Sequence, residues 1–198
     1  MSVKICISGK IAAGKTTLAQ ALAKRLDYQV VSFGSIIRET LKREGVEPTR
    51  DALHAKSYEI VASVGNYGAM DWFVANSPRI NWGNNLIVEG CRNPETYQRM
   101  QELFPVCLLV HCSCSEPTQI QRIIKRDGLE IEKIREIISR PVEEDLDGDF
   151  IKIADLINYE HTEQVKIMEE LEVLLQNSGS DNNRLYCINS TSRRNKCD

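Results

Sequence analysis

The sequence predicts an α/β protein built on a mostly parallel sheet. Short apolar runs of about five residues alternate with longer amphipathic stretches, which is typical of strands alternating with helices. A glycine-containing segment, residues 9–17, joins the first apolar run to the first amphipathic stretch. The chain has 198 residues, enough for one well-buried core and few for two, so we expect one principal domain.

Five apolar runs are the predicted strands. They are short, rich in β-branched residues and followed by turn or capping residues. The predicted strands cover residues 3–8, 29–33, 86–89, 106–110 and 154–158. With amphipathic stretches between them, these runs predict a five-stranded parallel sheet with helices on both faces.

The predicted helices are bounded by capping and breaking residues. Ser35 is a suitable N-cap for the helix after the second strand, Gly45 ends that helix, and Pro94 begins a later one. The predicted helices cover about residues 15–26, 35–43, 49–64, 70–75, 95–103, 116–125 and 161–175. Residues 77–85 are rich in Asn, Gly and Pro and predict a loop.

Two segments have a different character. Residues 127–140 open with an Asp-Gly break, carry many charges and stop before Pro141, which predicts a short, mobile lid. Residues 177–198 are rich in Ser, Asn and Arg, with one apolar run at 185–188, and predict a polar C-terminal tail after a domain of residues 1–176.

The segment between the first strand and the first helix matches G-x-x-x-x-G-K-[ST] in full, which identifies a phosphate-binding P-loop. Its residues are Gly9, Lys10, Ile11, Ala12, Ala13, Gly14, Lys15, Thr16 and Thr17. The glycines allow backbone N–H groups to curl round a polyphosphate at the positive end of the helix. Lys15 would reach the β- and γ-phosphates and Thr16 would ligate Mg²⁺, so the motif predicts ATP and Mg²⁺ as cofactors.

Composition points to small-molecule partners. The net charge is −3, from 25 basic and 28 acidic residues, and no long basic run favours nucleic acid or a membrane surface. No stretch approaches the roughly 18 apolar residues of a membrane span, and the chain enters its first strand without a signal peptide, so we expect a cytoplasmic protein. Residues 111–114, His-Cys-Ser-Cys, lack a second ligand pair at zinc spacing and are interpreted as strand-end and turn residues.

Five arginines stand where a phosphoryl-transfer site needs positive charge. One lies on the helix after the second strand, one just past the third strand, two a turn apart before the lid and one at the end of the lid; they are Arg38, Arg92, Arg122, Arg126 and Arg140. The alternative for each is a solvated ion pair on a helix surface.

In these segments the chain resembles the P-loop kinases of the nucleoside monophosphate kinase type. Residues 32–38, Ser-Phe-Gly-Ser-Ile-Ile-Arg, resemble the segment whose arginine holds the acceptor phosphate, and residues 89–92, Glu-Gly-Cys-Arg, resemble the end of that family's third strand. Residues 122–126 resemble the R-x-x-x-R before its lid, and Arg140 with the acidic residues 143–145 resembles the end of the lid. The third strand often ends in aspartate in that family, whereas here it ends in Glu89.

The resemblance implies an ATP- and Mg²⁺-dependent phosphotransferase with a nucleoside or deoxynucleoside monophosphate as acceptor. It implies that Arg38 and Arg92 bind the acceptor phosphate, that Arg122, Arg126 and Arg140 meet the transferring group, and that Glu89 reaches Mg²⁺ through water. Residues 46–84 would bind the acceptor. The alternatives are a hydroxyl-acceptor kinase with Glu89 as base, a dephospho-coenzyme A-like kinase and a regulatory NTPase without an acceptor.

Overall fold

The computed structural model describes residues 2–140, 143 and 146–180. Its strands and helices alternate along the chain, as the hydrophobic pattern predicts. The elements are β1 (Val3–Gly9), α1 (Lys15–Leu26), β2 (Gln29–Ser32), α2 (Phe33–Arg43), α3 (Arg50–Ala75), β3 (Leu86–Cys91), α4 (Pro94–Leu103), β4 (Val106–Ser113), α5 (Glu116–Asp127), α6 (Ile131–Ile138), α8 (Leu146–Ile153), β5 (Leu156–Tyr159) and α9 (Gln164–Ser180).

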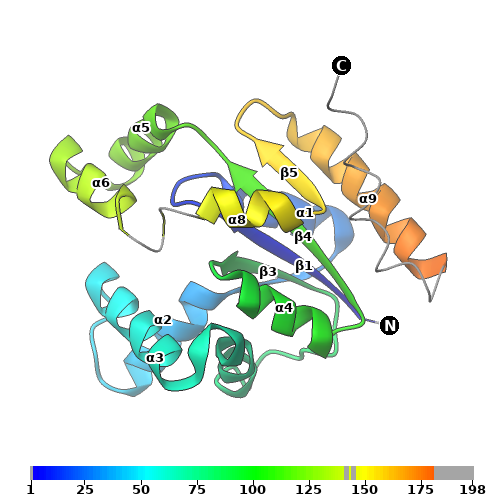
Figure 1. Ribbon diagram of the computed structural model, residues 1–198, viewed down its shortest axis with the longest axis horizontal. Coiled ribbons are helices and arrows are strands. Elements are labelled where there is room, and N and C mark those ends of the chain that lie inside the picture. Colours follow the sequence, from blue (N-terminus) through cyan, green and yellow to red (C-terminus); the bar gives the residue numbers. More distant parts are fainter. Residues whose placement is uncertain (1, 141–142, 144–145, 181–198) are drawn as a thin grey trace.

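The five strands form one sheet in the order β2-β3-β1-β4-β5, and every neighbouring pair is parallel. The prediction of a five-stranded parallel sheet is therefore confirmed. β1 lies at the centre, where Ile5 is opposite Ile87 on β3 and Leu108 on β4 (Figure 1). Because all the strands run the same way, their carboxyl ends meet at one edge of the sheet.

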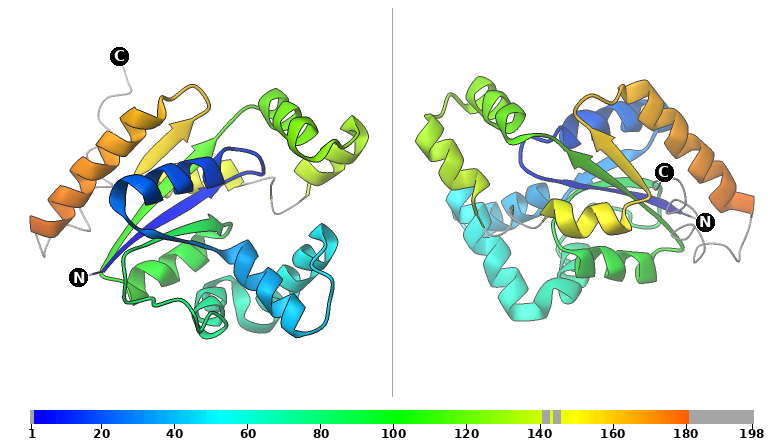
Figure 2. Two further views of the ribbon diagram at one scale, coloured as in Figure 1. Left: turned by 180° about the vertical axis from the view of Figure 1, so that it is seen from behind. Right: turned by 45° about the horizontal axis from the view of Figure 1, so that its top comes forward.

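Two layers of helices cover the sheet, and β1 shows how the sequence divides between them. Ile5 and Ile7 pack with residues of α1 and α9 on one face, whereas Cys6 packs with α2, α3, α4 and α8 on the other. This alternation follows from the two-residue period of a strand. Figure 2 shows α1 and α9 on the face turned away from α4 and α8.

Several boundaries differ from the sequence prediction. α2 begins at Phe33 rather than Ser35, and Ser32 is its N-cap. Residues 49–64 and 70–75, predicted as two helices, lie in α3, which consists of two helical parts joined across a kink: Gly65, with a φ of 72° and a ψ of 168°, is not helical, so the second part begins before residue 70. The helix α8 was not predicted, because its sequence is short and acidic and only Leu146 and Phe150 are buried.

The predicted lid and the predicted tail both contain helical residues that the sequence analysis did not predict. Within the predicted lid, residues 131–138 form α6, and Ile134 and Ile137 are buried. α9 continues to Ser180, so the first residues of the predicted tail are helical. Residues 181–198, including the apolar run at 185–188, lie outside the described residues.

The edge where the strands end is flanked by two helical pairs. Figure 1 shows α5 and α6 above this edge and α2 and α3 below it. At the same edge β1 comes very close to β4: a Cβ atom built on Gly9 would overlap the carbonyl oxygen of Cys112, and Gly9 has a φ of 135°. A glycine is therefore required where the central strand leaves the sheet.

We expect Gly9→Ala to lower the free energy of unfolding by about 3 kcal/mol, because the new methyl group meets backbone that is fixed by the sheet and the φ is unfavourable for alanine. Gly45→Ala is the control: Gly45 also has a positive φ, 74°, but no atom lies within 4 Å of its Cβ position. It should cost only about 1 kcal/mol. Urea unfolding of both variants checks the difference, and equal losses would contradict it.

Candidate active site

The P-loop connects β1 to α1 and folds as the motif predicts. Gly14, with a φ of 96°, is the N-cap of α1, and Ala12 has a φ of 59°. Alternating backbone conformations of this kind turn successive N–H groups toward one side and form an anion-binding nest. Since α1 begins directly at Lys15, its positive end adds to the attraction for phosphate.

Lys15 is folded back onto its own loop. Its Nζ donates hydrogen bonds to the carbonyl oxygens of Gly9 at 2.7 Å and Lys10 at 2.6 Å. Burial, and after it the positive charge of Arg92, lower the pKa of Lys15 to about 8. The ammonium group is thus held close to the phosphate site, but its charge is poorly stabilised without an anion.

Thr16 and Glu89 provide oxygen ligands beside the P-loop. The Thr16 hydroxyl lies 3.4 Å from Oε1 of Glu89, which stands on β3 next to the end of β1. The other carboxylate oxygen, Oε2, is buried without a hydrogen-bond partner. A hydroxyl and a carboxylate with a spare oxygen fit Mg²⁺, which prefers oxygen ligands and keeps several waters. Within residues 2–140, 143 and 146–180, no group of three or more His, Cys, Asp or Glu could hold a metal ion.

A cavity of about 780 Å³ opens over the P-loop. It gathers most of the residues that the sequence analysis selected, although these come from four separate parts of the chain. The predicted site residues that line it are Ile11, Ala12, Ala13, Gly14, Lys15, Thr16, Thr17, Arg38, Glu89, Arg92, Arg122 and Arg126. The end of β5 adds Asn158 and Tyr159, and the loop after it adds Glu160.

Two side chains of α5 donate hydrogen bonds to backbone carbonyls of the P-loop and so attach the helix to it. Arg122 donates from Nη1 to the carbonyl of Ala12 at 3.0 Å, and Gln119 donates from Nε2 to that of Ile11 at 2.9 Å. Arg140 is not among the residues that line the cavity; it donates to Asp51 on the first turn of α3 at 3.3 Å. Four of the five predicted arginines therefore face the cavity, and the fifth pairs beside it.

Glu143 holds the position that an anion would take. Its Oε2 accepts a 2.8 Å hydrogen bond from the backbone N–H of Ile11, and its Oε1 pairs with Nη1 of Arg92. The carboxylate is buried and also lines the cavity. Glu143 thus uses a P-loop amide and an arginine at once, which are two kinds of group that bind phosphates in proteins.

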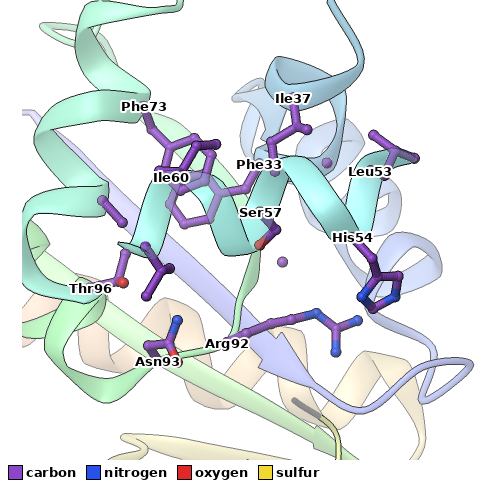
Figure 3. Close-up of a pocket in the computed structure, with 14 residues that line it drawn as sticks. Phe33, Ile37, Leu53, His54, Ser57, Ile60, Phe73, Arg92, Asn93 and Thr96 are labelled. Atoms are coloured by element: carbon purple, nitrogen blue, oxygen red, sulfur yellow. The ribbon is translucent and has the colours of Figure 1, made fainter. Parts of the chain in front are cut away.

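A smaller apolar cavity of about 170 Å³ adjoins the large one (Figure 3). Its apolar wall includes Phe33 and Phe73, whose rings stack with centroids 4.0 Å apart. Its polar residues are His54, Ser57, Arg92, Asn93 and Thr96. Leu53, His54 and Arg92 line both cavities, and Figure 3 shows Arg92 extending toward His54.

His54 stands between the two cavities. Burial, together with the nearby charges of Arg140 and Arg92, lowers the pKa of this imidazole. The ring is thus neutral at neutral pH and can both donate and accept a hydrogen bond.

The sequence analysis missed Arg50, which lines the large cavity from the start of α3. The only local signal was its place directly after a Pro-Thr helix start.

His111 has a structural role, because its two ring nitrogens lie 2.8 Å from the Ser8 hydroxyl and 2.9 Å from Asp147. This agrees with its interpretation as a structural residue.

Comparison with known proteins agrees with this geometry. The model of an AAA domain family, AAA_18, matches residues 5–144. A UPF0200 protein of Pyrococcus abyssi is 26% identical over 182 residues, covering 87% of this chain and 95% of the relative. A cytidylate kinase of Thermoplasma volcanium is 27% identical over 183 residues, covering 88% and 90%.

Solved structures show the fold. A shikimate kinase from Acinetobacter baumannii in complex with shikimate has a TM-score of 0.56 and 14% identity, covering 91% of this chain and 97% of that one. A gluconokinase from Sinorhizobium meliloti has a TM-score of 0.51 and 16% identity, covering 88% and 94%. The predicted P-loop kinase fold and the resemblance to nucleoside monophosphate kinases are confirmed.

No helix in the described part of the chain is long and apolar enough to cross a membrane.

We expect ATP binding to take up protons through Lys15. At pH 8 about half of the Lys15 side chains are neutral in the free protein, and phosphate restores the charge, so binding should take up about half a proton. The affinity for ATP should therefore fall as pH rises through about 8. Calorimetry in two buffers with different ionisation enthalpies measures the uptake. Lys15→Met should abolish it, whereas Lys24→Met, exposed at the far end of α1, should not.

We expect Glu143→Gln to bind pyrophosphate roughly tenfold more tightly, because the variant removes a negative charge that competes for Ile11 N–H and Arg92. Glu136→Gln, an exposed position on α6, is the control for a change in net charge. Titration calorimetry at fixed ionic strength makes the comparison. Unchanged or weaker binding in Glu143→Gln would show that the carboxylate supports the anion site and does not compete for it.

Proposed function

We propose that this chain, which belongs to the AAA_18 family of AAA domains, transfers the γ-phosphoryl group of ATP to a nucleoside or deoxynucleoside monophosphate. The P-loop, the kinase fold and the cytidylate kinase relative support the broader class, a nucleotide kinase-like phosphotransferase. The choice of a nucleoside monophosphate as acceptor rests on one observation, the junction of the two cavities. An apolar pocket suited to a flat ring opens onto a cavity rich in arginine, and Arg92 and His54 belong to both.

The donor phosphates would bind to the N–H groups of the P-loop, with the ATP base toward the loop after β5. Lys15 would exchange the carbonyls of Gly9 and Lys10 for the β- and γ-phosphates. Mg²⁺ held near Thr16 and Glu89 would neutralise charge on these phosphates. Lys15 would stabilise the charge that develops as the bond between the γ-phosphorus and its bridging oxygen breaks.

The acceptor would place its base between the α2 and α3 side chains of the apolar cavity and its phosphate beside Arg38 and Arg92. A phosphate monoester is already deprotonated at neutral pH, so its attacking oxygen needs cations and alignment but no general base. Arg122 and Arg126 would meet the transferring group from α5. Arg140 would join them by leaving Asp51. Arg92 must also release Glu143 for a phosphate to bind in this way.

A second candidate is a kinase that acts on a hydroxyl group. The observation that favours it is the unpartnered Oε2 of Glu89, which could accept the proton of an attacking hydroxyl. Arg38 and Arg92 line the same cavity, which favours the phosphate instead, since among the described residues a neutral acceptor would leave Arg38 without an anionic partner and Arg92 paired only with Glu143.

The test is a panel of acceptors with ATP and Mg²⁺: ribo- and deoxynucleoside monophosphates, nucleosides, dephospho-coenzyme A and small hydroxy acids. We expect a diphosphate product from at least one monophosphate. Lys15→Met should reduce its formation by roughly 100- to 1000-fold while leaving urea unfolding unchanged, and Lys24→Met should retain wild-type activity.

Products from hydroxyl acceptors alone would select the second candidate. ATP hydrolysis that no acceptor stimulates would instead identify a regulatory NTPase and contradict both kinase proposals. If dephospho-coenzyme A were the sole substrate, the apolar cavity would bind that molecule and not the base of a nucleoside monophosphate, and the proposed acceptor would be wrong.

A further inference from the structure

Three buried side-chain atoms among the described residues have no hydrogen-bond partner, and all three belong to residues that line the large cavity. They are Nη1 of Arg50, Oε2 of Glu89 and Oδ1 of Asn158. Buried polar atoms are nearly always paired in folded proteins, so a group of unpaired ones around one cavity marks the positions where a ligand completes the bonding. The oxygen of Glu89 is accounted for by the proposed Mg²⁺ site. The guanidinium of Arg50 has no role so far.

Within the described residues, the guanidinium of Arg50 is paired at one nitrogen and unpaired at another. It is the first residue of α3, whose N-cap Thr49 accepts a 3.2 Å hydrogen bond from the N–H of Ala52. Nη2 of Arg50 donates to Oδ2 of Asp127 at 2.9 Å. This bond pairs one end of the guanidinium and leaves the buried Nη1 at the other end without a partner in the described part of the chain.

Asp127 holds a second arginine as well. Arg126 donates to it from Nε and Nη2, both at 2.8 Å. The guanidinium of Arg126, and after it that of Arg50, keep the pKa of Asp127 below its ordinary value, so this carboxylate stays ionised at neutral pH. One carboxylate therefore balances two guanidinium groups, and the group of three retains one positive charge beside the cavity.

Arg50 also lies on the face of α3 that leads into the apolar cavity. Leu53, His54 and Ser57 follow it at the spacing of three, four and seven residues that places side chains on one helix face. Figure 3 shows these three residues on one helix above the pocket. Since Leu53 and His54 line both cavities, Arg50 stands one turn beyond them, on the side of the P-loop.

We propose that Arg50 binds the phosphate of the acceptor through its unpaired Nη1, while Asp127 holds the guanidinium in place. This inference rests on the proposed function, because it requires an acceptor that carries a phosphate. Arg50 then makes the site selective for phosphorylated acceptors: a nucleoside or a sugar without a phosphate leaves Nη1 unpaired. Asp127 acts as a positioning residue, since it contacts Arg50 and not the acceptor.

The decisive variant is Arg50→Lys, which keeps the positive charge beside Asp127 but has no second nitrogen to present. With the monophosphate that the wild-type protein phosphorylates best, we expect Arg50→Lys and Arg50→Gln to raise the acceptor KM about 10- to 100-fold and to change the ATP KM by less than threefold. Arg79→Gln, exposed in the loop after α3, removes a charge elsewhere and should match the wild type.

Asp127→Asn should raise the acceptor KM as well, and this rise in KM should vanish in the double variant with Arg50→Gln, because the carboxylate acts on acceptor binding through Arg50. Since Asp127 also holds Arg126, a loss of kcat should persist in the double variant. Calorimetric titration of the same monophosphate into protein saturated with a non-hydrolysable ATP analogue gives a readout independent of turnover.

An Arg50→Lys variant with wild-type acceptor KM would overturn the assignment, because the ion pair with Asp127 alone would then account for Arg50. Equal losses for ATP and acceptor would also overturn it and assign Arg50 to the docking of α5 on α3. A wild-type protein that phosphorylates no monophosphate would overturn the proposed function and the role of Arg50 together. Failure of the proposed function is thus distinguishable from failure of the Arg50 assignment alone.

Discussion

The close approach of β1 to β4 at Gly9 is the constraint on which the site depends. β1 is buried on both faces and paired on both edges, so its direction is fixed by the whole sheet. Where it ends, the backbone passes so near the carbonyl of Cys112 that no side chain fits. The P-loop therefore starts from a rigid point, and Lys15 can be held by the carbonyls of Gly9 and Lys10, which belong to that same turn.

A second constraint is electrostatic. The cavity brings four of the predicted arginines, Arg50 and Lys15 together, and the repulsion among like charges is felt most at Lys15, whose pKa is lowered by burial and by the charge of Arg92. The protein offsets that repulsion with its own acceptors: Glu143 on Arg92, Asp127 on Arg50 and Arg126, and main-chain carbonyls on Lys15 and Arg122. A phosphate could replace several of these contacts. Ligand binding would then exchange the protein's own carboxylates and carbonyls for phosphate oxygens, and these cations are not unpaired before the ligand arrives.

The sequence predicted the parts of this arrangement that depend on local pattern. The strands follow from apolar runs, and the P-loop from a motif whose glycines serve a specific backbone shape. Arg50 could not be found in this way, because its partner Asp127 is 77 positions away and only the fold brings them together. α6 was predicted as part of a mobile lid because its charges dominate the sequence, yet Ile134 and Ile137 are buried in the structure.

The positive charge of the arginines could not by itself select one acceptor among the phosphorylated molecules of the cell. Arginines bind any phosphate, including the phosphates of ATP itself, so discrimination has to come from what the rest of the molecule meets. Here one face at the start of α3 carries Arg50, Leu53 and His54. The apolar cavity, which Leu53 and His54 also line, includes Phe73, from beyond the kink of that helix, stacked on Phe33 of α2. In the proposed reaction the acceptor has to present a phosphate to the arginine-rich cavity and a ring to the apolar cavity at the same time. On this proposal the apolar cavity selects the ring, and Arg50 distinguishes a phosphorylated acceptor from one that merely fits the apolar pocket.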